Sequence, residues 1–340
     1  MSTPLPPTRQ AFHWRDEQMG ITVADLAFVG SDLERPESVL VTSSDVFAAD
    51  HVCGVVRVDG ERTPLRDVPE GFLPNGIALT QAGEFLIANL GDEGGVWRID
   101  ADHRLHPFLL EVNGRQLRNC NFVGYDDVGR LWVSVCTQQR PRMKAFNRHV
   151  ADGYIVLVDE HGARIVAEGL GFANECRVDP TGNWLYVNES TSRVLSRFPI
   201  ENVDGRARLG LKEQVYTFTD GDFPDGLNFD VEGGVWVACV VSNRVVRIDL
   251  AGRREVILDD ADPLLVAEAE QKWTIDGLDD AVARAGLTRT LHNVSCVAFG
   301  GDDMKTVYLG SLAGKRLATF RAEIAGARPA HWQFRSFSFR

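Results

Sequence analysis

A phrase of three short apolar segments recurs six times along the chain, and it constrains the fold more than any other feature. The middle segments of the six copies are DVFAAD, EFLIANL, RLWVSVC, NWLYVNES, GVWVACV and TVYLGSL. Val, Ile, Phe, Tyr and Trp dominate these segments, and Gly, Asp, Asn and Pro separate them, which is typical of strands joined by tight turns. Six copies with an irregular period of roughly 40 to 50 residues predict an all-β, six-bladed β-propeller with four-stranded antiparallel blades.

The ends of the chain and two insertions complete this expectation. We expect residues near ITVADLAFVG to pair with the C-terminal blade, which includes HWQFRSFSFR, and residues 1–340 to form a single domain. The insertions are Thr137–Gly153 in blade 3 and Asp262–Thr290 before blade 6. The second has Leu, Val and Ala at helical spacing, and its segment DGLDDAVARAG has an acidic start and a Gly stop, so we predict a short helical insertion there. Both insertions overhang the same end of the channel, so we expect residues 262–290 to form a lid, with an interface between subunits as the alternative. In either case the apolar residues of the segment, which include Leu264, Leu265, Val266 and Trp273, are expected to be buried.

Charge and composition exclude several classes of partner. The 340-residue chain carries a formal net charge of −12, which disfavours binding to nucleic acid or to an anionic membrane. We find no secretory signal and no apolar run long enough to span a bilayer. The six cysteines form no C-x-x-C pair and lie mostly in apolar runs, as expected of buried thiols in a reducing compartment. A cytoplasmic protein is the expectation.

Each copy of the repeat has an anchor residue at the start of its first strand. The anchors are Glu37, Asn75, Asn121, Asn174, Asp225 and Ser295. Innermost strands line the channel of a propeller, so side chains at equivalent positions point toward one axis. Glu37, Asn174 and Asp225 would supply two carboxylates and an amide, and Asn75 and Asn121 could add further oxygens. This set suits Ca²⁺ or Mg²⁺, Mn²⁺ less strictly, and Zn²⁺ also accepts carboxylate oxygens.

An ordinary structural explanation competes with the metal site. Pro followed by Asn or Asp and then Gly is common turn chemistry, in which the side chain bonds nearby backbone. Repetition at one topological position favours the site, because converging acceptors repel one another without a cation or water. His292 lies just ahead of the last inner strand, where it is either a general acid or base or an ordinary surface histidine.

Five segments in the same order resemble one known family. RPESVLV, LPNGIAL, FANECRVDPTGNWLYVNES, FPDGLNFDVEGGVWVACV and NVSCVAFGGDDMKTVYLGS are similar to segments of the gluconolactonase/regucalcin/luciferin-regenerating-enzyme family of six-bladed propellers. The resemblance implies that Glu37, Asn174 and Asp225 bind a metal, that Asp225 is also the suspected base, and that Asn121 contacts the substrate.

Three features depart from the family pattern. Asn119, with Arg118 adjacent, stands where sugar-lactone members of the family carry an Arg, and Glu175 stands where Gly is usual. The insertion before blade 6 is longer than the family's short link. For a small-molecule substrate, we expect the carboxylate of Asp225 or of Glu175 to act as the base that takes a proton from water. The residues expected to contact that substrate are Asn75, Asn119, Asn121 and His292.

The first functional hypothesis is a lactone hydrolase that depends on one divalent cation, with Ca²⁺ expected first and Mg²⁺, Mn²⁺ or Zn²⁺ also compatible. The metal would polarise the ester carbonyl and activate a water molecule. The alternatives are a metal-dependent lyase, dehydratase or isomerase on the same scaffold, or a non-catalytic calcium-binding propeller. A homo-oligomer is compatible with each hypothesis.

Overall fold

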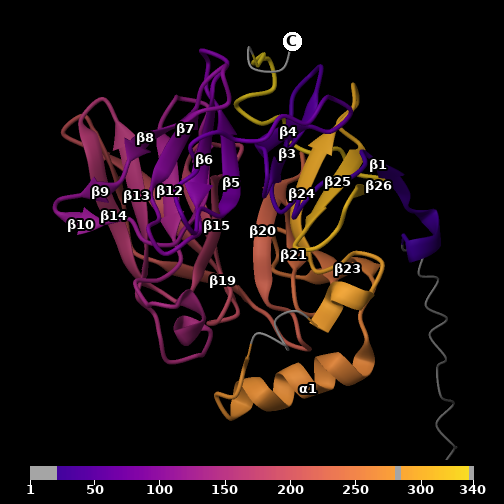
Figure 1. Cartoon of the computed structure of the whole chain (residues 1–340). Helices are drawn as coiled ribbons and strands as arrows, with labels where there is room; N and C mark the ends of the chain where they lie inside the picture. The colour runs from indigo at the N-terminus through magenta and orange to yellow at the C-terminus, as the bar shows by residue number, and fades with distance from the viewer. Residues whose placement is uncertain (1–20, 280–284, 337–340) are drawn as a thin grey trace, which may run out of the picture.

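Six antiparallel sheets stand around one axis in the computed structural model, which describes residues 21–279 and 285–336 (Figure 1). The innermost strands are β2 (Val39–Val41), β5 (Pro74–Leu79), β11 (Cys120–Tyr125), β15 (Ala173–Val178), β20 (Pro224–Phe229) and β24 (Val294–Gly300). Each innermost strand contacts the next, and β24 contacts β2, so the ring closes. The predicted six-bladed β-propeller is confirmed.

The outer strands follow the predicted segments closely. The second strands are β3 (Val46–Asp50), β6 (Phe85–Asn89), β12 (Leu131–Val135), β16 (Trp184–Glu189), β21 (Val235–Cys239) and β25 (Thr306–Ser311). The third strands are β4 (Gly54–Arg57), β7 (Val96–Ile99), β13 (Gly153–Asp159), β17 (Val194–Val203), β22 (Arg244–Ile248) and β26 (Leu317–Arg321). The outermost strands of blades 2, 3 and 5 are β8 (Leu105–Leu109), β14 (Gly162–Leu170) and β23 (Arg254–Asp259). A small hairpin, β9 (Glu111–Val112) and β10 (Arg115–Gln116), links blades 2 and 3.

Strand number and blade closure differ in detail from the expectation. Within the described ranges blade 1 has three strands, and blade 4 has five because β18 (Arg206–Leu209) and β19 (Glu213–Thr217) both pair with β17. The segment ITVADLAFVG contributes β1 (Ala27–Val29), which pairs with β26 and completes blade 6. In HWQFRSFSFR, residues 331–336 form turns and coil, and residues 337–340 lie outside the described part of the chain.

The helix of the last insertion lies earlier than DGLDDAVARAG. Helix α1 (Pro263–Thr274) begins where the Asp262 side chain accepts hydrogen bonds from two backbone N–H groups of its first turn. It ends where Asp276 adopts a left-handed φ of 57° and the Gly277 N–H bonds the Lys272 carbonyl, as in a Schellman motif. Residues 276–279 are therefore not helical, and residues 280–284 lie outside the described part. The short 3₁₀ helices are η1 (Val23–Asp25), η2 (Arg142–Ala145) and η3 (Ala285–Thr288).

Apolar side chains fill the spaces between neighbouring blades. Between blades 5 and 6, for example, Trp236 packs edge-on against Phe299 with 5.0 Å between ring centres. All six cysteines are buried and free, as the sequence predicted. This packing holds the innermost strands in a rigid ring.

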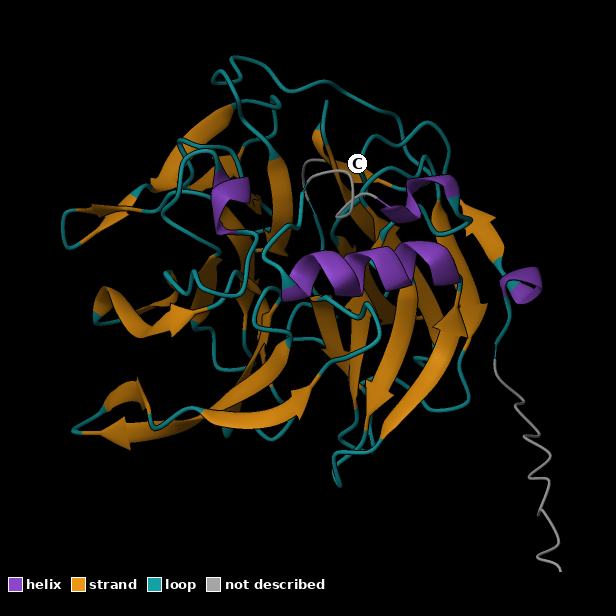
Figure 2. Ribbon diagram, turned by 90° about the horizontal axis from the view of Figure 1, so that it is seen from below, coloured by secondary structure: helices purple, strands orange, loops and turns teal. Residues whose placement is uncertain are grey.

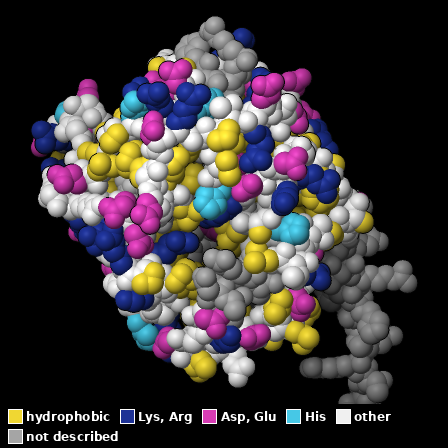
Figure 3. Space-filling view, in the orientation of Figure 1, with side chains coloured by type: hydrophobic (Ala, Val, Ile, Leu, Met, Phe, Trp, Pro, Cys, Tyr) yellow, Lys and Arg dark blue, Asp and Glu magenta, His cyan; other side chains and the backbone are white. Residues whose placement is uncertain are grey.

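The surface carries both charge signs. On the face that Figure 3 shows, Lys and Arg side chains are interspersed with Asp and Glu side chains. No helix among the described residues is long and apolar enough to cross a membrane.

Bulges interrupt five of the innermost strands at their anchor residues. The pairing with the second strand shifts register between Pro74 and Ile77 in blade 2 and between Pro224 and Leu227 in blade 5, and equivalent shifts occur in blades 3, 4 and 6. A bulge leaves its residue unpaired and redirects the side chain. The anchor pairs Asn75-Gly76 and Asp225-Gly226 thus lie in bulges inside strands and do not connect one strand to the next.

The glycines that follow two of the anchors permit close approach between blades. A Cβ on Gly76 would lie 2.7 Å from the Phe122 Cα, and a Cβ on Gly226 would lie 2.4 Å from the Ser295 carbonyl oxygen. Real Cβ atoms do not approach backbone so closely. These glycines therefore bring neighbouring inner strands, and with them the anchors, together.

We expect Gly226→Ala to lower the free energy of unfolding by about 2–3 kcal/mol, because the added methyl group forces blades 5 and 6 apart. Urea unfolding followed by tryptophan fluorescence measures this change. Gly277→Ala is the matched control, since a Cβ there meets its nearest neighbour at an ordinary 3.5 Å. Equal destabilisation by both substitutions would contradict the role given to Gly226.

Candidate functional site

The six anchors lie buried at one end of the channel. Each of the six anchor residues is at most 5% exposed. They are Glu37, Asn75, Asn121, Asn174, Asp225 and Ser295. They come from six different blades, so the fold gathers residues that are far apart in the sequence. This convergence is what the repeat predicted.

Blades 1, 2 and 3 are joined through the Asn75 amide. Its Nδ2 donates to Glu37 Oε1 at 3.0 Å and to the Asn121 carbonyl at 2.8 Å. Its Oδ1 accepts from Nη2 of Arg35 at 2.8 Å. Asn75 thus uses its oxygen within the protein, whereas the sequence had suggested that this oxygen could be a ligand. From blade 6, the Ser295 hydroxyl donates to the Glu37 carbonyl at 2.8 Å.

Blades 4 and 5 are joined by a second set of contacts. Nδ2 of Asn174 donates to the Ser190 hydroxyl at 3.1 Å, and that hydroxyl donates to the Pro224 carbonyl at 2.6 Å. Asn188 Nδ2 donates to the Asp225 carbonyl at 2.9 Å. These bonds fix the backbone on both sides of the Asp225 side chain.

Two buried side-chain oxygens of the anchors have no hydrogen-bond partner among the described residues. They are Oε2 of Glu37 and Oδ1 of Asn174. A buried acceptor without a partner costs roughly 1–3 kcal/mol. Such a cost is tolerated where a ligand supplies the missing partner.

Three carboxyl groups share this end of the channel. Burial raises the pKa of Glu37 to about 7, with Arg35 opposing the shift. Burial, followed by the charges of Glu37 and Glu175, raises the pKa of Asp225 well above its ordinary value. Burial also raises the pKa of Glu175. Burial and mutual repulsion therefore disfavour the charged forms of these carboxyl groups in the protein alone, and a cation would favour them.

Glu175 is the least available of the three carboxylates. Its Oε2 accepts from Arg177 Nε at 3.1 Å and from the Leu227 N–H at 3.2 Å. The Arg177 Nη2 lies 3.0 Å from the same oxygen. The sequence analysis did not predict that Arg177 pairs with Glu175. The spacing was a signal for this pair, because residues two apart on a strand face the same side.

Asn119 and His292 make their contacts elsewhere. The buried Asn119 donates from Nδ2 to the Thr137 and Gln139 carbonyls, both at 3.1 Å, and so holds the start of the blade 3 insertion. His292 is exposed, and its Nδ1 lies 2.7 Å from the Leu287 carbonyl. Neither contacts an anchor among the hydrogen bonds of the described residues, and their assignment to the substrate stays a prediction.

The opposite end of the channel has a different character. A cavity of about 130 Å³ there is lined by the far ends of the inner strands and by residues 327–331 of the C-terminal segment. No anchor lines this cavity. We therefore place the candidate site at the anchor end, because the convergent polar groups lie there.

The two insertions meet across the anchor end. Figure 2 shows α1 lying across the strands at this end. The Arg148 Nε of the blade 3 insertion lies 2.9 Å from Asp276 Oδ1, just after α1, and His149 Nε2 lies 2.9 Å from Asp276 Oδ2. Phe146 packs against Phe172 and Phe223, which immediately precede the inner strands of blades 4 and 5.

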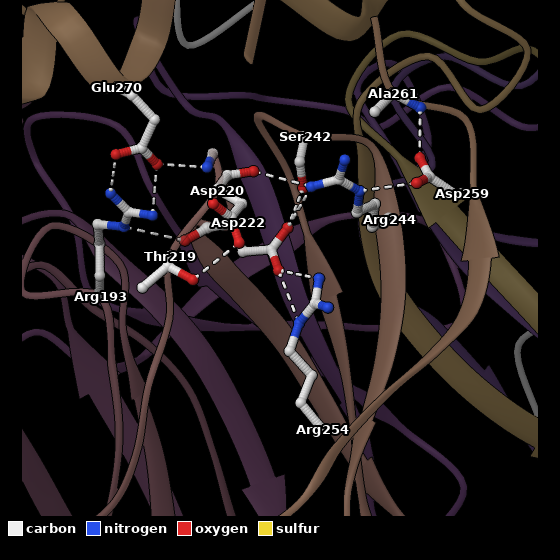
Figure 4. A network of polar contacts seen from close by, with 11 residues as sticks. Arg193, Thr219, Asp220, Asp222, Ser242, Arg244, Arg254, Asp259, Ala261 and Glu270 are labelled. Atoms are coloured by element: carbon white, nitrogen blue, oxygen red, sulfur yellow. Dashed lines mark hydrogen bonds and ion pairs between the residues drawn. The ribbon is translucent and has the colours of Figure 1, made fainter. Parts of the chain in front are cut away.

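A buried arginine fastens α1 to the propeller. Arg193 is 2% exposed, its guanidinium lies 4.9 Å from the ring centres of both Phe223 and Trp273, and its Nη2 is 2.6 Å from Glu270 Oε1 (Figure 4). The Trp273 indole N–H donates to the Thr191 carbonyl at 3.2 Å. These contacts bury one side of the helix. Leu264, which we expected to be buried, is 82% exposed because it lies on the other side.

We expect Glu270→Gln to loosen α1 by about 1–2 kcal/mol, since it weakens a charge-assisted pair that is only partly shielded from water. If the insertion is a lid, KM for the substrate or the range of substrates changes while metal binding is retained. Glu268→Gln is the matched control, because Glu268 pairs with Lys272 on the surface of the same helix. Identical kinetics for both variants would contradict the lid.

The sequence pattern described as the SMP-30/Gluconolactonase/LRE-like region matches residues 46–262. A curated relative, 6-deoxy-6-sulfogluconolactonase of Pseudomonas putida, is 27% identical over 244 residues, which cover 71% of this chain and 70% of the relative.

Two solved structures share the fold. A gluconolactonase from Xanthomonas campestris aligns with a TM-score of 0.60 at 16% identity, over 88% of this chain and 89% of that one. A regucalcin from Agrobacterium tumefaciens, described as a calcium-binding protein, aligns with a TM-score of 0.56 at 15% identity, over 90% and 94% of the two chains. The resemblance that the sequence motifs suggested is confirmed, since the matched region 46–262 spans more than half of the 340 residues. The chain belongs to the SMP-30/gluconolactonase/LRE-like family.

Proposed function

We propose that the protein hydrolyses a lactone ring with the help of one divalent cation held by Glu37, Asn174 and Asp225. The observation that carries the proposal is the pair of buried anchor oxygens without partners, Glu37 Oε2 and Asn174 Oδ1, beside the buried Asp225 carboxylate. Membership of the family and the lactonase activity named for the Pseudomonas relative support the substrate class. Sugar lactones are therefore the first compounds to test.

The donor set fits a hard cation. Two carboxylates and an amide oxygen are oxygen ligands of the kind that Ca²⁺ takes. No group of three His, Cys, Asp or Glu side chains within the described ranges is arranged to hold a metal, so the Asn174 amide is needed as a ligand. Ca²⁺ is our first choice, because oxygen donors suit it and the regucalcin structure is described as calcium-binding. When bound, the cation would supply Lewis-acid polarisation of the lactone carbonyl and a lower pKa for a nearby water.

Asp225 is the better of the two candidate bases. Burial and the neighbouring carboxylates raise its pKa, which strengthens it as a proton acceptor. Glu175 is less suitable, since Arg177 and the Leu227 N–H already occupy its Oε2. In the proposed reaction Asp225 takes one proton from water, the hydroxide adds to the acyl carbon, and the ring C–O bond breaks. The ring oxygen takes up the proton held by Asp225 as it leaves, which returns Asp225 to its starting form, and Asn121 orients the substrate.

A lactone panel in ¹⁸O-labelled water tests the proposal. We expect acid release that stops after chelation and returns with Ca²⁺, with one ¹⁸O atom in the product carboxylate. A rearranged or dehydrated product without ¹⁸O would instead support the lyase, dehydratase or isomerase alternative. Calcium binding without turnover of any lactone would support the non-catalytic propeller.

A further inference from the structure

We infer that Arg35 is a positioning residue, which sets the orientation of the Asn75 amide and thereby presents one oxygen of Glu37 to the channel. The inference rests on the proposed function in one respect, namely that Glu37 is a cation ligand. Arg35 was not among the residues that the sequence singled out.

The contacts form one chain of hydrogen bonds from blade 1 to blade 2 and back. Arg35 donates from Nη1 to the Pro74 carbonyl at 2.9 Å and from Nη2 to Asn75 Oδ1 at 2.8 Å. Asn75 then donates from Nδ2 to Glu37 Oε1 at 3.0 Å. Arg35 thus contacts Glu37 through Asn75, which is 1% exposed.

The chemistry of the groups fixes the direction of this chain. A guanidinium carries only donors, so the amide atom that faces it must be the oxygen of Asn75. The amide nitrogen must then face Glu37 Oε1 and the Asn121 carbonyl, which are both acceptors. With the amide reversed, the nitrogen would face the guanidinium donor and the oxygen would face two acceptors. Arg35 therefore allows only one orientation of the Asn75 side-chain amide.

Glu37 is held on two sides as a result. Its Oε1 accepts from Asn75, its backbone carbonyl accepts from the Ser295 hydroxyl at 2.8 Å, and its Oε2 is left without a partner among the described residues. This arrangement assigns different tasks to the two carboxylate oxygens. Oε1 is used for orientation, and Oε2 is the oxygen offered to the cation.

The backbone at Arg35 supports a specific role for its side chain. Arg35 has a φ of 55°, in the left-handed region that glycine or asparagine adopts more easily. A non-glycine residue persists in such a conformation where surrounding contacts compensate for it. Here the forked contacts to blade 2 supply that compensation.

The test combines two measurements on four proteins: the wild type, Arg35→Asn, Asn75→Ala and the double variant. Asparagine tolerates the left-handed backbone at position 35, so Arg35→Asn removes the guanidinium without adding strain. In calorimetric titration of calcium into chelator-stripped protein, we expect Arg35→Asn and Asn75→Ala each to weaken binding about tenfold or more, and the double variant to be no weaker than Asn75→Ala. Additive losses in the double variant, or wild-type affinity in Arg35→Asn, would overturn the inference.

The second measurement does not depend on a metal. The side-chain amide signal of Asn75, identified by its loss in Asn75→Ala, is expected to exchange with solvent at least tenfold faster in metal-free Arg35→Asn than in metal-free wild type. Unchanged exchange would overturn the positioning role. The wild type could bind no calcium while the Asn75 amide still exchanges faster in Arg35→Asn than in the wild type. That result would leave Arg35 as the positioning residue and would refute the cation assignment.

Arg164→Asn is the matched control. Arg164 makes a similar fork, to the Asp159 carboxylate at 2.7 Å and to the Ala207 carbonyl at 2.8 Å, in blades 3 and 4. We expect this variant to melt at a lower temperature but to keep wild-type calcium affinity and wild-type exchange at Asn75. A loss of affinity in Arg164→Asn equal to that in Arg35→Asn would mean that any lost arginine fork weakens the site, and would overturn the inference.

Discussion

Asp225→Ala is expected to lower kcat about 10³-fold and to weaken calcium binding, while the propeller remains folded. The residue supplies both the proposed base and a carboxylate ligand, so its loss affects two steps at once. Asp225 is repelled by Glu37 and Glu175, and burial further disfavours its charge. The metal-free variant should therefore be at least as stable as the metal-free wild type. A lactone turnover assay measures the first effect, elemental analysis and calorimetric titration measure the second, and thermal unfolding measures the third.

Two comparison variants separate the site from general damage. Asn174→Ala should weaken binding less than Asp225→Ala, because it removes a neutral ligand. Asp222→Ala should leave the site intact but lower the free energy of unfolding by roughly 3–5 kcal/mol, because Asp222 is fully buried and its loss leaves Arg254 and Arg244 without their shared partner (Figure 4). Unchanged metal content in Asp225→Ala would refute the assignment of Asp225 as a ligand.

Removal of the cation is expected to have the second large effect. Treatment with a chelator should abolish lactone hydrolysis, and added Ca²⁺ should restore it. Because the cation binds the folded chain, Ca²⁺ at 100 times its Kd should also stabilise the protein by about 2.7 kcal/mol. The physical reason is the same in both cases, since the fold brings together the carboxylates of Glu37 and Asp225 and the unpartnered oxygen of Asn174.

Thermal unfolding with and without Ca²⁺ checks this stabilisation, and Asp225→Ala is the control in which it should disappear. Magnesium, manganese and zinc in place of calcium establish which cation the site prefers. Full activity in the chelated protein, with no shift in melting temperature on adding any of the four cations, would refute metal dependence.

The architecture was predictable because each strand is specified by a short local pattern of residues, and this pattern recurs six times. Alternating apolar residues and turn residues indicate strands wherever they occur, and six copies leave a propeller as the natural closure. The anchors were predictable for the same reason, since an equivalent position in each copy must point toward the axis. The short helical insertion was predictable, but residues 276–279 of DGLDDAVARAG are not helical, and residues 280–284 lie outside the described part of the chain. Helix α1 instead occupies Pro263–Thr274, where the Asp262 cap and the contact with Arg193 stabilise it.

The sequence by itself determined the blades, the six anchors and the presence of two insertions at one end of the channel, because strand periodicity and turn chemistry act over a few residues. Tertiary structure alone decided how the anchors use their atoms. The Asn75 oxygen is taken by Arg35, Glu175 is tied to Arg177, and Asp276 joins the two insertions. Such contacts depend on atomic positions set by bulges and by packing between blades. No local pattern specifies which of several nearby acceptors a buried donor will reach.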